Sequence, residues 1–313
     1  MRVFSLGEVL WDVFQDTEFL GGAPLNFSAN AQRLGNSVLL LSAVGDDARG
    51  RRAAAQMSAM GLTTELVQIV TECPTGTAVI VTDHSGSASY VIQRPAAFDC
   101  VRVDEPILSR LQEFDPDWIY FGTLTQIDSR CLNALTEIIR RSPDAKRFYD
   151  MNLRTGHWNF ALVQDLSRIA TVLKLNDAEA ELLFHHVFSD KPFSLEEFCR
   201  YWSAAYGIQT ICTTLGGAGC AVFMDGTLRT FPGYPVEVVD TVGAGDAFAA
   251  AFLHGFHLGW TVERIAPLAN SLGALVAGRA GATPAWTLDE CLEFTGSALS
   301  TRDSRLQSEE FER

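Results

Sequence analysis

The chain has 313 residues, of which 47% are apolar and 20% charged, the composition of a globular protein with room for a full hydrophobic core. Its formal net charge of −14 without a basic run argues against nucleic acid or an anionic membrane as the main partner, because both attract lysine and arginine. Seven scattered cysteines without a C-x-x-C spacing argue against a disulfide framework or a zinc site.

The sequence shows no pattern of a membrane span or an export signal. Its longest apolar stretches fall far below the ~20 residues that cross a bilayer. Glu8 and Asp12 interrupt the N-terminal apolar run before it could form a signal peptide. We therefore expect a cytoplasmic protein.

The first third of the chain alternates short apolar runs with stretches of helical period. Continuous apolar runs are typical of parallel strands covered on both faces, and glycines end the helical stretches as C-caps. The last two runs flank a polar turn at 83–87 and predict an antiparallel hairpin. The predicted strands cover 3–6, 38–44, 77–82 and 88–93, and the predicted helices cover 24–34 and 49–60.

From residue 104 onward, strands and helices alternate regularly, which implies βαβ units and a mostly parallel sheet. Ligands of such sheets bind at the carboxyl ends of the strands. A second hairpin surrounds Asp225 and Gly226, and the polar tail 301–313 is expected to fray. The predicted strands cover 117–122, 147–150, 171–175 and 209–214, and the helices 128–141, 160–169, 177–184, 194–206, 246–259 and 262–278.

Residues 240–248, Asp-Thr-Val-Gly-Ala-Gly-Asp-Ala-Phe, form a glycine-rich turn that opens a helix. Such a turn directs several backbone N–H groups at one point and is suited to an anion. Asp246 lies in the first helical turn, where it could accept a proton from a hydroxyl that attacks phosphorus. The residues alone equally allow a simple turn followed by a helix cap.

The string 240–248 closely resembles the C-terminal signature of the PfkB carbohydrate kinases. The segment 21–35 resembles the N-terminal signature of that family, and the sequence 45–50 matches its G-x-D-x-x-G stretch. Similar likenesses in the same order cover nearly the whole chain. They are Asn176-Asp-Ala-Glu179 for the N-x-x-E motif and Thr214-Leu-Gly216-Gly-Ala-Gly219 for the T-x-G-x-x-G element.

The resemblance implies an α/β fold, a ribokinase-like three-layer sandwich with a mostly parallel central sheet and a small β-rich lid. It implies one kinase domain over 1–313, with the lid formed by about 11–22 and 75–98. It also implies an enzyme that uses ATP and Mg²⁺. Lid strands of the family often pair between subunits, so a homodimer through the lid is compatible with the resemblance.

By the same resemblance Asp246 is the catalytic base, and the N–H groups of Gly243, Ala244, Gly245 and Asp246 form an anion hole. Asn176 and Glu179 would order Mg²⁺, its waters and the phosphates. From the residues alone, Asn176 is equally a turn residue at the end of a strand, and Glu179 is equally an acid in the first turn of a helix, where the helix dipole favours it. The residues assigned to the nucleotide by similarity are Thr214, Gly216, Gly219 and Asn270, the last of which could equally lie on a surface face.

Many members of the family also bind a monovalent cation such as K⁺ beside the anion hole. Asp240 stands at the position of the family's ligand, with the carbonyls of Val242 and Gly281 as its partners. From the residues alone, Asp240 is equally a turn-initiating aspartate.

The sugar side resembles the family at Asp12, Gly22 and Asn26, which would bind hydroxyl groups. Asp150-Met-Asn-Leu-Arg154 looks like the D-x-N-x-R run of the fructokinase-like branch and favours D-fructose as acceptor. Arg94 on the lid would contact the sugar or stay solvated, and Arg154 would face the phosphates or the substrate. Ribose, 2-keto-3-deoxygluconate and nucleosides remain alternative acceptors. The keto acid needs a cationic partner for its carboxylate, which Arg94 or Arg154 could provide.

The chain lacks the motifs of two other classes of nucleotide-binding protein. The chain has no G-x-x-x-x-G-K-[ST] string, and Gly7-Glu-Val-Leu-Trp occupies the place where a dinucleotide-dependent oxidoreductase has G-x-G-x-x-G. A non-catalytic binding protein with the same fold remains as the alternative from a different class. The intact Asp246 and its turn argue against it.

Overall fold

The computed structural model describes residues 1–14, 17–82 and 88–294. Its largest feature is a nine-stranded sheet in the order β13-β12-β11-β10-β9-β8-β1-β4-β5. The strands from β11 to β5 pair in parallel, and β12 and β13 join that sheet antiparallel at one edge. The strands are β1 (Arg2–Leu6), β4 (Ser37–Gly45), β5 (Val67–Val70), β8 (Trp118–Phe121), β9 (Lys146–Asp150), β10 (Val172–Asn176), β11 (Thr210–Thr214), β12 (Cys220–Met224) and β13 (Thr227–Phe231).

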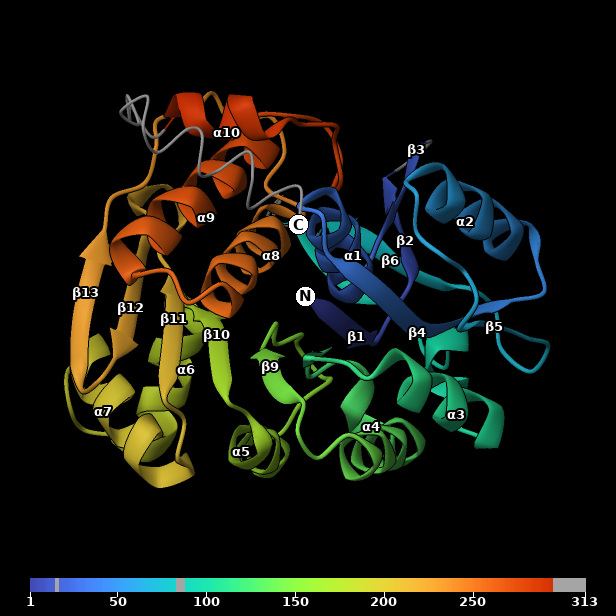
Figure 1. Cartoon of the computed structure of the whole chain (residues 1–313), viewed down its shortest axis with the longest axis horizontal. Coiled ribbons are helices and arrows are strands. Elements are labelled where there is room, and N and C mark those ends of the chain that lie inside the picture. The colour runs from blue at the N-terminus through green and yellow to red at the C-terminus, as the bar shows by residue number, and fades with distance from the viewer. Residues whose placement is uncertain (15–16, 83–87, 295–313) are drawn as a thin grey trace.

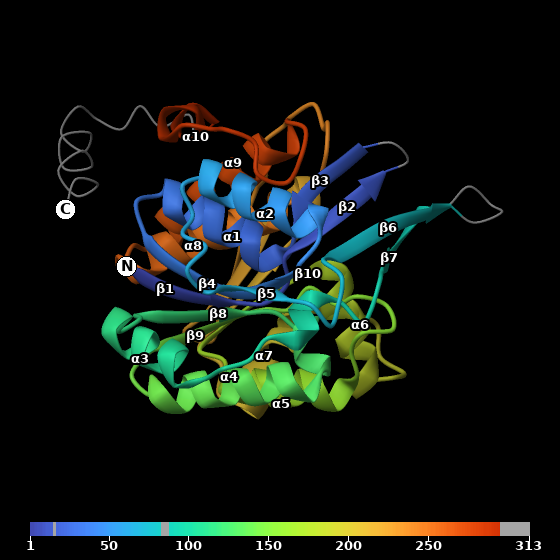
Figure 2. The same cartoon turned by 90° about the vertical axis from the view of Figure 1, so that its right-hand side faces the viewer.

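Helices cover both faces of this sheet and complete the predicted three layers (Figures 1 and 2). None of the described helices is long and apolar enough to cross a membrane. One face is covered by α1 (Ala23–Arg33), α2 (Ala48–Ala59), α8 (Ala244–His257), α9 (Val262–Ala277) and α10 (Leu288–Phe294). The other face is covered by α3 (Glu105–Phe114), α4 (Ser129–Arg141), α5 (Phe160–Ile169), α6 (Asp177–Val187) and α7 (Leu195–Tyr206).

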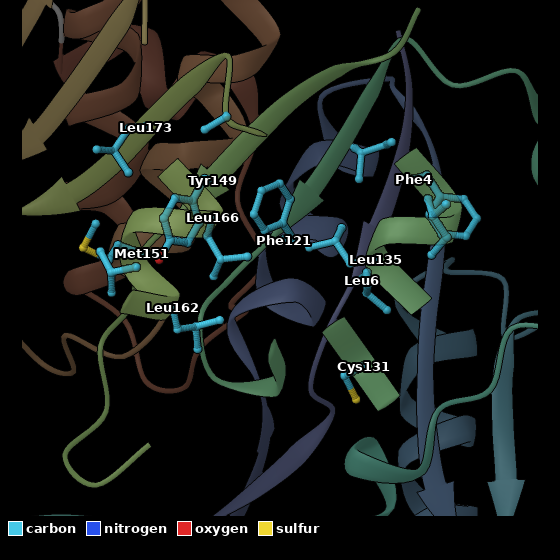
Figure 3. Packing of buried hydrophobic residues seen from close by; sticks show 14 of the residues in the cluster. Phe4, Leu6, Phe121, Cys131, Leu135, Tyr149, Met151, Leu162, Leu166 and Leu173 are labelled. Carbon is cyan, nitrogen blue, oxygen red and sulfur yellow. The ribbon is translucent and has the colours of Figure 1, made fainter. Parts of the chain in front are cut away.

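The central strands β4 and β8 are mostly apolar because both of their faces are buried. Successive side chains of a strand point to opposite faces, so Phe121 and Tyr149 pack toward α4 and α5 while Tyr120 and Phe148 pack toward α1 and α8. Figure 3 shows the first of these two cores, with Phe4, Leu6 and Phe121 among the labelled side chains. The two cores fix both helical layers on the sheet.

A second sheet of four strands, in the order β3-β2-β6-β7, projects from one side of the molecule (Figure 2). It consists of β2 (Leu10–Phe14), β3 (Thr17–Gly21), β6 (Gly76–Thr82) and β7 (Ala88–Ile92). The predicted hairpin is confirmed as β6 and β7, and β2 lies parallel to β6. This sheet lies within the segments predicted to form the lid, and its role as a lid stays a prediction. The turn 83–87 and the tail 301–313 lie outside the described residues.

Candidate active site

The N-termini of α1 and α8 bring two predicted site residues together. Asp246 lies in the first turn of α8, and Asn26 lies near the start of α1. Nδ2 of Asn26 donates to Oδ2 of Asp246 at 2.9 Å, and the two residues are only 2% and 7% exposed. Oδ1 of Asn26 is buried and has no hydrogen-bond partner in the part of the chain that the structure describes. This buried acceptor is open to a hydrogen bond from a water molecule or a ligand.

Glycine caps allow the two helices to begin where they do. Gly22 precedes α1 with φ 115°, and a Cβ atom there would lie 2.3 Å from the carbonyl oxygen of Glu8. Gly243 precedes α8 with φ 81°, and a Cβ atom there would lie 2.1 Å from the carbonyl oxygen of Ala282. Neither position has space for a side chain, and positive φ values favour glycine.

The surroundings of Asp246 suit a general base. Its pKa is raised to about 6, mainly because burial disfavours the charged form. The neighbouring Asp150 raises the pKa further, whereas Lys174, the hydrogen bond from Asn26 and the charge of Arg154 lower it. A carboxyl group with this pKa is ionised at neutral pH and is still basic enough to accept a proton.

Two further carboxyl groups and one guanidinium group interact electrostatically with Asp246. The predicted residue Asp12, on β2, is buried, and burial raises its pKa to about 6. Glu8 follows β1, accepts a hydrogen bond from the Ala23 backbone N–H at 3.2 Å and has its pKa raised to about 7 by burial. The charge of Arg154 lowers both of these pKa values. Sequence reasoning missed Glu8, although its place directly after an apolar strand was a signal.

The two predicted arginines lie in different surroundings. Arg94 is almost buried, pairs with the carboxylate of Asp99 and donates to the Leu124 carbonyl oxygen at 2.8 Å. Its charge is therefore already neutralised, and a sugar contact by Arg94 stays a prediction. Arg154 is exposed, and its guanidinium group forms no hydrogen bond or ion pair with any residue in the described ranges. Of these two guanidinium groups, only that of Arg154 is available to a ligand.

Asn176 and Glu179 form a capping box at the start of α6. Oδ1 of Asn176 accepts from the Glu179 backbone N–H at 2.8 Å, and Oε2 of Glu179 accepts from the Asn176 backbone N–H at 2.9 Å. Oε1 of Glu179 also accepts from the Leu153 backbone N–H at 2.6 Å. Glu179 is therefore an acid in the first turn of a helix, as its alternative interpretation predicted, whereas Asn176 is the cap of that helix. A ligand role for both stays a prediction, and it is compatible with these bonds because each carboxylate oxygen has a further lone pair.

The residues assigned to the nucleotide lie at the edge of the sheet formed by β11 to β13. Thr214 ends β11, and an exposed 3₁₀ turn, Gly216–Ala218, follows it and leads to Gly219. Nδ2 of Asn270 on α9 donates to the Pro232 carbonyl oxygen at 3.0 Å and to that of Phe231 at 3.3 Å. Asn270 therefore holds the end of β13 against α9, and its contact with adenine stays a prediction.

Asp240 joins the two segments predicted to bind a monovalent cation. Its Oδ1 accepts from the Val242 backbone N–H at 3.0 Å, and its Oδ2 accepts from the Gly281 backbone N–H at 3.2 Å. The three predicted residues are therefore brought together beside the N-terminus of α8. A role for Asp240 in organising these loops is observed, and cation binding is left for the proposal below.

The model for the pfkB family of carbohydrate kinases matches residues 3–288. The chain belongs to this family. It is 28% identical over 312 residues to an ATP-dependent ribose-1-phosphate kinase from Halopiger xanaduensis, covering 94% of this chain and 98% of the relative. It is 27% identical over 315 residues to a fructokinase from Vibrio alginolyticus, covering 94% and 99%.

Two solved structures share the fold of this PfkB kinase. A fructokinase with bound ATP from Xylella fastidiosa has a TM-score of 0.80 and 21% identity, covering 94% of this chain and 97% of that one. A putative ribokinase II in complex with ATP and Mg²⁺ from E. coli has a TM-score of 0.80 and 22% identity, covering 94% and 98%. The predicted ribokinase-like fold is therefore confirmed. As a PfkB carbohydrate kinase, the enzyme transfers a phosphoryl group from ATP to a sugar hydroxyl.

The residues of this PfkB kinase fit Mg²⁺ that arrives with the nucleotide. No cluster of three or more histidine, cysteine, aspartate or glutamate side chains suited to a metal occurs within the described residues. Mg²⁺ commonly keeps several waters and is held by one or two carboxylates together with substrate phosphates. The buried carboxylate of Glu179, fixed by two backbone N–H groups, can take part in such a site through water.

Proposed function

We propose that this PfkB kinase phosphorylates D-fructose to fructose 6-phosphate, with Asp246 as the general base. The observation that carries the proposal is the buried contact between Asn26 and Asp246, which leaves one acceptor atom of Asn26 without a donor. A primary hydroxyl of the sugar would donate to Asp246, and a neighbouring hydroxyl would satisfy Oδ1 of Asn26. Asp12 and the backbone at Gly22 would bind further hydroxyl groups.

In the proposed reaction, the O–H bond of the acceptor breaks and its proton passes to Asp246. The freed oxygen forms a bond to the γ-phosphorus as the bond from that phosphorus to the bridging oxygen breaks, and ADP leaves. The backbone N–H groups of Gly243, Ala244, Gly245 and Asp246 would face the charge that develops on the transferring group. Mg²⁺, when bound through Asn176 and Glu179, supplies neutralisation of the phosphate charge.

The charge of the pocket favours a neutral acceptor over an anionic one. Glu8, Asp12 and Asp246 are three buried carboxyl groups on the sugar side, and Arg154 is the cation whose charge acts on all three. A phosphate or carboxylate on the acceptor would be placed among these acids with a single guanidinium to neutralise it. The carboxyl groups can each accept hydrogen bonds from sugar hydroxyls.

Two alternatives keep the reaction and change the acceptor. One is an anionic sugar, 2-keto-3-deoxygluconate or a sugar phosphate such as the ribose 1-phosphate named for the relative from Halopiger xanaduensis. The exposed, unpaired Arg154 favours this alternative. The other is ribose or a nucleoside, which the same hydroxyl-binding residues would accept.

The test is ADP release with MgATP and a panel of acceptors: fructose, ribose, ribose 1-phosphate, ketodeoxygluconate and a nucleoside. We expect fructose to give the highest kcat/KM. An Arg154→Ala variant distinguishes the alternatives, because loss of Arg154 should lower kcat/KM far more for an anionic acceptor than for fructose. Turnover of an anionic acceptor alone, abolished in that variant, would overturn the fructose assignment and keep the kinase.

We also propose that K⁺ binds between the segments that Asp240 joins, with carbonyl groups of Val242 and Gly281 as further ligands. The convergence of these three residues beside the catalytic turn supports this site. We expect K⁺ to activate the wild-type enzyme and an Asp240→Ala variant to lose this dependence. The same turnover in KCl and in choline chloride would refute the site.

A homodimer through the lid is the third part of the proposal. β3 and β7 form the two edges of the four-stranded lid sheet, and strand edges can pair with another chain. Sedimentation velocity of the wild-type enzyme measures the assembly state. A monomer at micromolar concentration would refute the dimer without affecting the proposed chemistry.

A further inference from the structure

A buried ion pair lies on the face of the central sheet that α1 and α8 cover. Nζ of Lys174 donates to Oδ1 of Asp150 at 2.9 Å, and the hydroxyl group of Tyr120 donates to Oδ2 of the same carboxylate at 2.7 Å. The three residues come from the neighbouring strands β8, β9 and β10, and Lys174 and Asp150 stand directly opposite each other in the parallel register. All three are buried.

Packing fixes the position of this network. The ring of Phe27 on α1 stacks on that of Tyr120, with their centroids 3.8 Å apart. Asp150 thus accepts two hydrogen bonds from groups that the sheet and α1 hold in place. Burying a charged lysine is costly unless it is paired, so a well-packed apolar residue would serve stability at least as well. The network therefore calls for an explanation other than stability.

The ammonium group of Lys174 lies beneath the catalytic turn. A Cβ atom built on Gly245 would be only 3.1 Å from Nζ of Lys174, so this position of the turn lies against the ammonium group. Gly245 directly precedes Asp246. The lysine thus approaches the turn from strand β10 of the central sheet.

We propose that Lys174 is a positioning residue for the catalytic base: its ammonium group, held by Asp150 and Tyr120, keeps Asp246 in the carboxylate form that accepts the proton of the acceptor. The inference rests on the proposed role of Asp246 and is independent of which sugar is phosphorylated. Asp150 acts in the opposite direction, because its negative charge favours protonated Asp246. The pair thus sets the protonation of the base through two opposing charges.

Other ionisable groups that face Asp246 are the same in every variant. Glu8 lies after β1 and Asp12 lies on β2. Arg154 lies in the segment after β9, and Tyr120 lies on β8. The phosphates of ATP add a further titrating group. Since these groups are common to every variant, a difference in pH profile between two variants reports the charge that was substituted.

The experiment measures the acidic limb of the pH profile of kcat/KM for the sugar at saturating MgATP. That limb reports the ionisation of the essential base in the enzyme before the sugar binds. We expect Lys174→Met to move it to higher pH and Asp150→Asn to move it to lower pH, each by about one pH unit. The acidic limb of the double variant should lie at a pH between those of the two single variants. A purely structural role would lower activity without this pair of opposite shifts.

Breaking the ion pair can also destabilise the protein, so the experiment needs a second comparison and a control variant. If Lys174→Met alone does not fold, the comparison of Asp150→Asn with the double variant removes the same charge without leaving an unpaired carboxylate. Tyr149→Phe is the matched control, because its hydroxyl group bonds to Thr123 on the opposite face of the sheet. Its profile should match that of the wild type.

An infrared titration gives a second readout that needs no turnover. The difference spectrum between each protein and its Asp246→Asn counterpart isolates the carboxyl band of Asp246. We expect its midpoint to shift in the same two directions as the profile. Unmoved midpoints, or shifts of one sign in both single variants, would overturn the inference. Absence of turnover with every sugar would instead refute the proposed function, and the infrared midpoints would still decide the role of Lys174.

Discussion

The amide group of Asn26 and the carboxylate of Asp246 meet at 2.9 Å across 220 residues of sequence. Each residue stands near the start of a helix whose cap is a glycine with positive φ. Helix N-termini carry a partial positive charge, so two of them converge on the position proposed for the reacting hydroxyl and the transferring phosphoryl group. This convergence combines a base, a hydroxyl acceptor and an anion site in one small volume.

The first prediction is that Asp246 contributes to the rate of phosphoryl transfer and not to the affinity for the sugar. Asp246→Asn should lower kcat by about 10²–10⁴, the usual contribution of a positioned base, and leave the affinity for the sugar largely unchanged. The amide can still accept the hydrogen bond from Asn26, so the pocket keeps its shape. Turnover gives the rate and calorimetry gives the sugar affinity. Full turnover by this variant would remove Asp246 from the role of base.

The second prediction separates Asn26 from its neighbour on the same helix. Asn26→Ala removes the acceptor Oδ1 and the donor to Asp246, so KM for the sugar should rise at least about tenfold, in line with a lost hydrogen bond to a charged group. Asn30 lies one turn further along α1 and accepts from the indole N–H of Trp286 at 2.7 Å. We therefore expect Asn30→Ala to lower stability and to leave KM unchanged. Equal KM values in both variants would contradict the proposed sugar contact.

The third prediction concerns how Asp246 makes the free energy of unfolding depend on pH. The pKa of Asp246 is raised from 3.8 to about 6, so between these values the folded state binds more protons than the unfolded state. Stability therefore falls as pH rises through this window, and above it the full cost is about 3 kcal/mol. Asp246→Asn removes this cost. We expect the variant to be more stable than the wild type at pH 8 and to lose its advantage near pH 4.

Urea unfolding at the two pH values measures this difference. Glu8 and Asp12 also have raised pKa values, and they contribute to both proteins with the same sign. The charge of Asp246 is a minor cause of both raised pKa values, so its loss lowers them slightly and adds to the advantage of the variant at pH 8. An unfolding free energy that is the same for both proteins at pH 8 would show that burial of Asp246 is not costly.

Much of the fold could be predicted because its strands are buried on both faces. The runs that became β4 and β8 are mostly apolar, the shorter runs of β9 to β11 alternate regularly with helices, and the glycine-rich turn before α8 marks the predicted site. The lid strands β2 and β3 could not be read in the same way, because Asp12 and Glu18 interrupt their apolar pattern. Residues 236–239 contain three valines and Glu237 and are not part of a strand, and Val238 and Val239 are each 60% exposed.

The network of Lys174, Asp150 and Tyr120 was not predicted, since it depends on the lateral order of three strands. That order brings together residues 24 and 30 positions apart, and no local period encodes it. A signal existed nevertheless. Lys174 is one of three lysines in the chain, and it interrupts a strand of otherwise apolar residues before Asn176. A charged residue in a strand that must be buried predicts a partner on a neighbouring strand.

The last prediction tests the geometry of the catalytic turn with two glycines that share a conformation. Gly243 has φ 81° and Gly259, which follows the other end of α8, has φ 71°. A Cβ atom at Gly243 would meet the Ala282 backbone, whereas at Gly259 no atom lies within 4 Å. Both alanine variants should therefore lose about 1 kcal/mol through the unfavourable φ. Gly243→Ala must in addition displace the turn, and a shift of about 1 Å typically costs about 10² in rate. We expect kcat/KM to fall by that order in Gly243→Ala and to be unchanged in Gly259→Ala, and equal activities would show that the turn does not position Asp246.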